Sequence, residues 1–200
     1  MYVFDLDGTL VESVEAHISA WTEALSLMGV RKGVEEIRPL MGLPAADIAK
    51  RLLPERAREL ALLKNKLFLD KYIALVRAYG DVDVLEKLSR PLAVVTSSSG
   101  YVARAVLEKV GLLRYIDLVL GGDEVARGKP APDPLHVVAR RLGISTRNMV
   151  VVGDSEYDME MAKSAGACGV CITRQRTCKG GSFYISTLHE LLSRSFCQGV

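Results

Sequence analysis

Two aspartates near the start of the chain carry the strongest signal for chemistry. Asp5 and Asp7 follow the apolar or β-prone run 1–4, and Gly8 comes directly after them. Side chains two residues apart on a strand point to the same face, so both carboxylates could reach one site. Carboxylates that close repel each other unless a cation or a shared proton intervenes, which favours a divalent metal. An ordinary strand-to-loop turn, where Asp and Gly are common, accounts for the same residues without chemistry.

Four hydroxyl residues in a row, Thr96 to Ser99, follow a second apolar run at 92–95. They lead into a helical pattern, and backbone amides at a helix start together with hydroxyl groups make a good cradle for a phosphate. The alternative is helix capping, for which one Ser or Thr suffices. Four hydroxyl groups exceed that need, so the sequence favours an anion site at residues 96–99.

Charged residues follow two later apolar runs. Lys129 stands between a glycine and a stiff proline, which would fix its approach, although a lone lysine is most often a solvated surface charge. Asp154 and Asp158 are four residues apart at a helix start and therefore face the same way. Stabilisation of the helix dipole by acidic residues, worth roughly 0.3–1 kcal/mol, explains one of these acids better than it explains both.

The elements that must hold these residues alternate between strand and helix from residue 82 onward. Such alternation predicts a parallel sheet covered by helices on both faces. The apolar runs at 92–95 and 149–152 agree with burial on both sides. Ligands bind beyond the carboxyl ends of the strands in such sheets, where the polar residues above stand. We expect strands at 1–4, 91–96, 116–120, 149–152 and 169–173, and helices at 84–89, 102–111, 135–142, 157–165 and 187–192.

The segment between residues 13 and 80 has a different, wholly helical pattern. Apolar residues at spacings of three and four predict a helix over 13–29, and prolines can begin helices over 44–52 and 54–80. No strand pattern occurs in the stretch 31–79. We therefore expect a helical insertion with its own small core.

Composition and charge narrow the class of protein. The 200 residues are 49% hydrophobic and 25% charged with a net charge of +2, which is typical of a globular protein without a basic face for nucleic acid or an anionic membrane. No apolar run approaches the ~18 residues of a membrane span, and the chain opens with a strand pattern rather than a signal peptide. We expect a cytoplasmic protein, and both a monomer and a dimer fit the sequence.

The polar groups at the strand ends, taken in order, resemble the four signature motifs of the haloacid dehalogenase superfamily of phosphatases. Residues 122–133 resemble its branch with a helical cap between motifs one and two. The resemblance implies an α/β, Rossmann-like core domain at 1–12 and 81–200, with a helical cap domain at 13–80. It runs from residue 2 to about residue 192, and its matches are Asp5-x-Asp7-Gly-Thr9, Thr96, Lys129-Pro130 and Gly153-Asp154-x-x-x-Asp158.

The resemblance implies catalysis through an aspartyl-phosphate intermediate. Asp5 would be the nucleophile, and Asp7 the general acid that protonates the leaving oxygen and then the base that activates water. The acid role calls for a pKa of Asp7 above the usual aspartate range, lifted by neighbouring carboxylates. Mg²⁺ is the implied cofactor, held by Asp5, the backbone carbonyl of Asp7 and Asp154, with Asp158 as a ligand or as support behind the ligands.

Four residues are implied at the substrate. Thr96 and the Ser97 amide would grip the phosphoryl oxygens, and Lys129 would offset the charge between them and Asp5. His17, on the first helix, has two interpretations that fit the sequence equally. It is either a proton relay on the cap side or simply a polar residue of that helix.

The implied substrate is a small phosphorylated metabolite, and hydrolysis of a phosphomonoester as in phosphoglycolate phosphatases is favoured. A phosphosugar mutase similar to β-phosphoglucomutase is one alternative, because His17 and Trp21 resemble residues of that enzyme. However, Met41 and Ala45 stand where its cap loop has a lysine and an arginine that anchor a second phosphate. Asp7 argues against a dehalogenase, which lacks the second aspartate. A pyrophosphatase, a nucleotidase and a silent binding domain that kept the fold are the remaining alternatives.

The four cysteines have two interpretations. Cys168 and Cys171 cannot pair with each other in an extended strand, because three positions span about 10 Å and a bridge needs Cα atoms within about 7 Å. Buried free thiols are the ordinary state in the cytosol. The chain has only two Asn and two Gln, however, and such depletion is typical of proteins from hot environments, some of which hold intracellular disulfides. A disulfide from Cys168 or Cys171 to Cys178 or Cys197 is the second interpretation.

Overall fold

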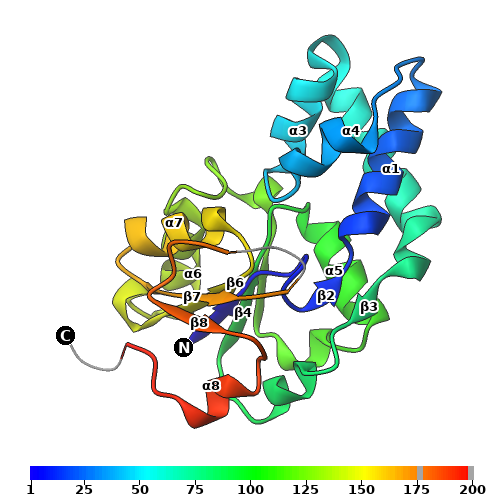
Figure 1. Cartoon of the computed structure of the whole chain (residues 1–200). Helices are drawn as coiled ribbons and strands as arrows, with labels where there is room; N and C mark the ends of the chain where they lie inside the picture. Colours follow the sequence, from blue (N-terminus) through cyan, green and yellow to red (C-terminus); the bar gives the residue numbers. More distant parts are fainter. Residues whose placement is uncertain (175–177, 198–200) are drawn as a thin grey trace.

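The centre of the protein is a six-stranded parallel sheet with the first strand in its middle (Figure 1). The computed structural model describes residues 1–174 and 178–197. The strand order is β5-β4-β1-β6-β7-β8, and every neighbouring pair is parallel, which confirms the expected α/β fold. The strands are β1 (Tyr2–Phe4), β4 (Leu92–Val95), β5 (Leu118–Leu120), β6 (Val150–Gly153), β7 (Cys168–Ile172) and β8 (Phe183–Ile185).

Helices cover both faces of this sheet, and successive strand residues pack into two different clusters. Phe4 packs in the cluster that includes Val102 and Val106 of α5, whereas Val3 packs in the cluster that includes Val138 of α6 and Met161 of α7. Because side chains alternate along a strand, burial of both residues explains the continuous apolar runs. These helices are α5 (Gly100–Lys109), α6 (Asp133–Leu142), α7 (Glu156–Ser164) and the short α8 (Glu190–Ser193).

A group of helices, here called the helical lobe (residues 14–75), stands to one side of the sheet (Figure 1). Its apolar residues recur at helical spacing and form a separate cluster that includes Trp21, Ile48 and Leu60. This confirms the expected helical character and separate small core of the segment. The α-helices of the lobe are α1 (Val14–Leu27), α2 (Val34–Ile37), α3 (Ala45–Leu52) and α4 (Ala57–Asp70).

The two chain segments that connect the lobe to the sheet pair with each other. β2 (Val11–Glu12) and β3 (Arg77–Ala78) form a two-stranded antiparallel ribbon. The expectation of no strand in 31–79 is therefore wrong, as is the helix over 54–80, since α4 ends at Asp70. A two-residue strand is too short to show a period in the sequence. The pairing also depends on residues 65 or more positions away, because Val11 pairs with Ala78 and Glu12 with Arg77.

Other differences from the expected elements lie after the lobe. Residues 84–89 do not form an α-helix, and β8 was not expected. The last helix is Glu190–Ser193 rather than the expected 187–192. Short segments such as these lack the length that a periodic pattern needs. The shorter 3-10 helices are Arg38–Leu40, Pro54–Arg56, Tyr72–Leu75, Val82–Glu86, Leu113–Tyr115, Gly122–Glu124 and Thr146–Asn148.

Two disulfides tie the end of the chain to β7. Cys168 pairs with Cys197, and Cys171 pairs with Cys178. The second interpretation of the cysteines is thus confirmed, and neither bond joins the two cysteines of β7 to each other. Within residues 1–174 and 178–197, no helix is both long and apolar enough to cross a membrane.

A buried ion pair fastens the loop after β7 beside the ribbon. Arg174 Nη2 lies 2.7 Å from Asp81 Oδ1 and 3.3 Å from the carbonyl oxygen of Thr9. The other oxygen of Asp81 accepts bonds from Thr187 Oγ1 at 2.9 Å and the Leu188 amide at 2.8 Å. The core thus holds the segment that directly follows β3.

Candidate active site

The carboxyl end of β1 places the first two predicted residues. The Asp5 amide continues the sheet by bonding the carbonyl oxygen of Val152 at 2.9 Å, and the chain then turns at Gly8, whose φ is 91°. A Cβ added at Gly8 would lie 2.4 Å from Asp154 Oδ2. Glycine is thus required twice here, for its backbone conformation and for the approach of the Asp154 carboxylate.

Lys129 lies between two carboxylates. Its Nζ is 2.6 Å from Asp5 Oδ1 and 2.6 Å from Asp158 Oδ1, and its side chain is 3% exposed. Burial alone would lower the pKa of Lys129, but Asp158 and Asp5 outweigh it and hold the ammonium protonated. Burial raises the pKa of Asp5 well above the usual range, Lys129 opposes this, and Asp158 and Asp154 add to it. The surface-charge interpretation of Lys129 is therefore wrong.

The two carboxylates that contact Lys129 form a cluster with a third carboxylate, that of Asp154. Oxygen atoms of Asp5, Asp154 and Asp158 all lie within 4.8 Å of one another. Asp158 is held by Ser155, whose hydroxyl donates to Asp158 Oδ2 at 2.5 Å and accepts from the Asp158 amide at the start of α7. A buried cluster of carboxylate oxygens with one lysine to balance it suits a hard divalent cation such as Mg²⁺. The residues present therefore fit a metal.

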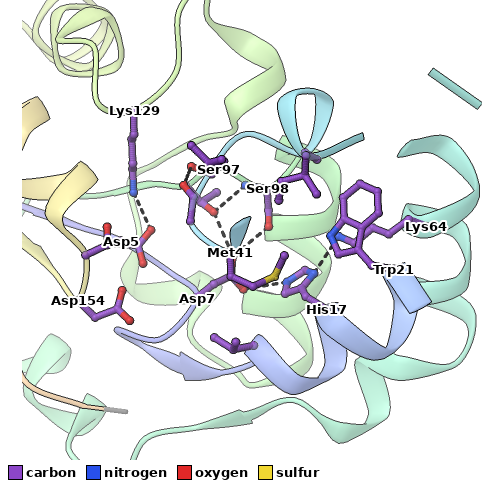
Figure 2. Close-up of a pocket in the computed structure, with 17 residues that line it drawn as sticks. Asp5, Asp7, His17, Trp21, Met41, Lys64, Ser97, Ser98, Lys129 and Asp154 are labelled. Atoms are coloured by element: carbon purple, nitrogen blue, oxygen red, sulfur yellow. Dashed lines mark hydrogen bonds and ion pairs between the residues drawn. The ribbon is translucent and has the colours of Figure 1, made fainter. Parts of the chain in front are cut away.

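Asp7 does not join this cluster with its side chain, because its carboxylate points toward the helical lobe (Figure 2). Asp7 Oδ1 accepts from Ser13 Oγ at 2.6 Å and lies 3.1 Å from His17 Nε2. Asp7 Oδ2 accepts from Ser98 Oγ at 2.9 Å and Thr96 Oγ1 at 3.2 Å. The predicted metal contact of Asp7 was through its backbone carbonyl, so this orientation leaves that prediction untested.

The expected rise in the pKa of Asp7 is wrong for this arrangement. Burial alone would raise that pKa, but His17, Ser13 and Ser98 outweigh it and hold the pKa well below the usual range. The carboxylate is surrounded by donors rather than by other carboxylates, and hydrogen bonds to the charged form favour that form. Asp7 is thus in the form that accepts a proton.

His17 connects Asp7 to a lysine of the lobe. The imidazole is 6% exposed and stacks on the Phe68 ring with 4.0 Å between centroids. Its Nδ1 lies 2.8 Å from Lys64 Nζ (Figure 2). Burial and then Lys64 lower the pKa of His17. Because the ammonium can only donate, a neutral His17 accepts at Nδ1 and donates from Nε2 to Asp7. His17 is therefore part of the site; the proton-relay role stays a prediction.

The hydroxyl groups at the end of β4 bond two different parts of the site. Thr96 Oγ1 and Ser98 Oγ face Asp7, whereas Ser97 Oγ donates to the Gly42 carbonyl of the lobe at 2.7 Å. The amides of Ser98 and Gly100 are occupied, by Thr96 Oγ1 at 3.0 Å and by Asp123 at 2.8 Å. The Ser97 amide has no such bond to the residues described, so it is available to an anion, and its contact with a phosphoryl oxygen stays a prediction.

These groups line one small cavity between the sheet and the lobe. Its volume is about 50 Å³. A water molecule needs about 10–15 Å³ by this measure, so this volume corresponds to a few water molecules. The polar wall includes Asp5, Asp7, His17, Lys64, Thr96, Ser97, Ser98, Lys129, Asp154 and Ser155, and the apolar wall includes Val14, Trp21, Met41, Leu43, Ala45 and Ile48 (Figure 2).

Sequence reasoning did not assign Lys64, Ser13 or Ser98 to the site. Lys64 carried a detectable signal, because it occupies the buried stripe of α4 with Leu60 and Phe68, at spacings of four. A charged residue in an apolar stripe is either paired or functional. Ser13 carried no signal, and Ser98 appeared only as one of the four hydroxyl residues at 96–99. Only the folded chain brings the hydroxyl groups of these two serines to Asp7.

Comparison with protein families gives one decisive match. Residues 2–172 match the family described as haloacid dehalogenase-like hydrolase. The chain belongs to that family. This haloacid dehalogenase-like hydrolase is also similar to two named enzymes in sequence, and its relatives make it a phosphoric monoester hydrolase.

One relative is fructose-1-phosphate phosphatase YqaB of Escherichia coli K12, 32% identical over 171 residues that cover 82% of this hydrolase and 91% of the relative. Another is the phosphoglycolate phosphatase of Neisseria meningitidis, 33% identical over 184 residues that cover 85% of this hydrolase and 78% of the relative.

Solved structures show the same fold. A predicted phosphoglycolate phosphatase from Haemophilus somnus has a TM-score of 0.85 at 22% identity, with 96% of both chains covered. CbbY from Rhodobacter sphaeroides in complex with phosphate has a TM-score of 0.82 at 23% identity, with 95% of both chains covered.

Proposed function

We propose that this hydrolase is a Mg²⁺-dependent phosphatase for a small phosphomonoester, similar to phosphoglycolate phosphatase, and that it works through an aspartyl-phosphate on Asp5. The observation that carries the proposal is the position of Asp5. Its carboxylate borders the cavity, lies 2.6 Å from Lys129 Nζ, and belongs to the cluster with Asp154 and Asp158. The two named relatives, a phosphoglycolate phosphatase and a fructose-1-phosphate phosphatase, support a small substrate.

The first half-reaction breaks the phosphoester bond. A carboxylate oxygen of Asp5 attacks phosphorus, and the ester oxygen leaves with a proton from Asp7. Ser98 and Thr96 now donate to Asp7, and they turn to the phosphoryl oxygens when a substrate is present. Asp7 then takes up from solvent the proton that it passes to the ester oxygen. The Ser97 amide and Lys129 neutralise charge on the phosphoryl group.

The second half-reaction frees Asp5 and leaves a proton on Asp7, which returns that proton to solvent when Ser98 and Thr96 donate to Asp7 again. Asp7, held as a carboxylate by Ser13 and His17, accepts a proton from water as the water oxygen attacks phosphorus and the bond to Asp5 breaks. Asp5, Asp154 and the backbone carbonyl of Asp7 would hold Mg²⁺, with Asp158 beside them. The ion supplies positive charge that offsets the phosphoryl oxygens and Asp5.

The helical lobe has the position of a cap over this chemistry. We assign residues 13–80 to a cap domain and residues 1–12 and 81–200 to the core. His17 and Lys64 from the lobe reach the cavity, and Gly42 bonds Ser97 across it. Closure of such a lobe excludes water and selects the leaving group.

Phosphate release from small phosphoesters, measured with Mg²⁺ and with EDTA, tests this function. We expect activity that depends on Mg²⁺ in the wild type and is lost in Asp5→Asn. Mass spectrometry of acid-quenched enzyme should find the phosphoryl group on the peptide that contains Asp5. Full activity in Asp5→Asn would contradict the covalent mechanism. Conversion of a sugar 1-phosphate to its 6-phosphate without phosphate release would instead identify a mutase.

A further inference from the structure

The lobe places a lysine in the active-site cavity that has no carboxylate partner among the described residues. Lys64 of α4 is 2% exposed and lines the cavity. Its Nζ lies 2.8 Å from His17 Nδ1 and 3.4 Å from Asn65 Oδ1, and no carboxylate of residues 1–174 and 178–197 lies within 4.0 Å of it. An ammonium has three N–H donors, so these contacts leave one for a ligand.

The surroundings of Lys64 favour an anionic ligand. Its Nζ lies 5.3 Å from the centroid of the Trp21 ring and 5.2 Å from that of Phe68, so aromatic faces replace much of its hydration. Buried charges in proteins are ordinarily paired, because an isolated one is costly to take from water. A negative charge that enters with the substrate would complete the pair.

The spacing between Lys64 and Asp7 fixes the length of that substrate. His17 bridges the two, with hydrogen bonds of 3.1 Å to Asp7 and 2.8 Å to Lys64. A leaving group beside the imidazole, bonded to Asp7 through its ester oxygen and to Lys64 through its other end, must therefore be about as long as one imidazole ring, given ordinary hydrogen bonds of about 2.7–3.2 Å. The small volume of the cavity, about 50 Å³, agrees with a short leaving group.

We infer that the leaving group is a short hydroxy acid, such as glycolate, whose carboxylate pairs with Lys64 while its ester oxygen faces Asp7. This inference rests on the proposed phosphatase function and names the substrate class of the same cavity. Lys64 is then a residue that selects substrate by charge, in addition to its bond to His17. The apolar walls, Trp21 and Ile48 among them, suit the carbon atoms between the two anionic ends.

A purely structural role of Lys64 makes a different prediction. If the lysine only holds the ring of His17, its removal should affect every phosphoester to the same extent. If it pairs with the substrate, its removal should affect only substrates with a carboxylate. The ratio of two substrates therefore separates the two roles.

The experiment compares 2-phosphoglycolate with 2-hydroxyethyl phosphate, which replaces the carboxylate by a neutral group on a chain of the same length. In the wild type with Mg²⁺ we expect kcat/KM for phosphoglycolate to be larger by about thirtyfold or more, the effect of one desolvated charge pair. Lys64→Met should bring this ratio close to one. Lys66→Met on the same helix, with a side chain 71% exposed, is the matched control and should keep the wild-type ratio.

Binding to Asp5→Asn, measured by calorimetry, gives a second readout that needs no turnover. Phosphoglycolate should bind more tightly than the neutral ester, and the added Lys64→Met change should remove the difference. Equal kcat/KM and equal affinity for the two esters in the wild-type background would overturn the inference, even if the Lys64 variant does not fold. Hydrolysis of neither these esters nor other small phosphoesters would instead overturn the proposed function.

Discussion

The hydroxyl of Ser97 donates a hydrogen bond to the carbonyl oxygen of Gly42, with 2.7 Å between the two oxygens. This bond joins the end of β4 to the loop before α3, on opposite sides of the cavity. Asn65 Nδ2 makes a second bond of the same kind to Ser99 Oγ at 3.1 Å. The segment whose amide is available to phosphate therefore also holds the closed lobe.

Removal of the Ser97 hydroxyl should weaken closure and leave phosphate recognition in place. Ser97→Ala keeps the backbone amide and loses one neutral hydrogen bond, with a net value of about 0.5–1.5 kcal/mol. We expect kcat/KM to fall by about twofold to tenfold for every substrate alike, since the closed population falls. Ser26→Ala, at an exposed position of α1, is the control. Unchanged kinetics in Ser97→Ala would show that this bond does not contribute to closure.

Replacement of Lys129 should destabilise the fold as well as abolish catalysis. Lys129→Met leaves the buried carboxylates of Asp5 and Asp158 without their cation, which costs about 3–5 kcal/mol when they are ionised. Where folding raises the pKa of a carboxyl group, the free energy of unfolding falls as pH rises above the pKa of that group in the unfolded chain. The loss of stability in Lys129→Met should therefore be complete at pH 7 and should shrink as pH falls. Urea unfolding across that range measures it, with Lys66→Met as a control expected within about 0.5 kcal/mol of the wild type. A deficit independent of pH would contradict this account.

The charge of Lys64 should set a pH limit on carboxylate substrates. Burial lowers the pKa of Lys64 to about 8, although Asp7 opposes the shift. Above that pH the amine is neutral, and kcat/KM for phosphoglycolate should fall by about tenfold per pH unit, whereas that for 2-hydroxyethyl phosphate should not show this step. Lys64→Arg, which keeps its charge, should remove the step. Parallel profiles for the two esters would contradict the assignment.

The lowered pKa of Lys64 also predicts a change in stability with pH, opposite in sign to the change in kcat/KM. Between about pH 8 and the ordinary lysine pKa of 10.5, the unfolded chain binds the Lys64 proton and the folded chain does not. The free energy of unfolding should therefore rise with pH through this window, relative to Lys64→Met. Denaturant titrations of both proteins at several pH values check this sign.

The two disulfides should stabilise the fold unequally. Cys168 and Cys197 are separated by 29 positions, and Cys171 and Cys178 by 7. Chain-entropy arguments give about 3–4 kcal/mol for a loop of the first length and about 2–2.5 kcal/mol for the second. Chemical unfolding of Cys197→Ala and Cys178→Ala, compared with the oxidised wild type, should show this order. Unfolding midpoints that do not respond to a reductant would contradict it.

The sheet and the strand-end residues could be predicted because their causes are local. Val3 and Phe4 are both buried, so β1 appears in the sequence as a continuous apolar run that ends at Asp5. Parallel topology then brings the ends of β1, β4 and β6 to one edge, whatever the details of the intervening helices. The gathering of Asp5 and Asp154 follows from that topology alone.

What could not be predicted depends on contacts between distant parts of the chain. β2 and β3 are two residues long and owe their form to each other. The low pKa of Asp7 likewise results from Ser13, His17 and Ser98, of which Ser98 arrives from 91 positions away. A sequence pattern records the burial of a residue, but not which donors will surround it.

The ribbon of β2 and β3 decides how the lobe can move. Both connections to the core run side by side and are hydrogen-bonded to each other, so they act as a single pivot rather than as two independent tethers. Asp81, just after β3, is anchored by Arg174 and Leu188, which keeps the base of that pivot stationary. If the lobe opens and closes on this pivot, His17 and Lys64 should return along the same arc to Asp7. The ribbon would thereby set how His17 and Lys64 align with Asp7, although it lies far from any atom that the substrate touches.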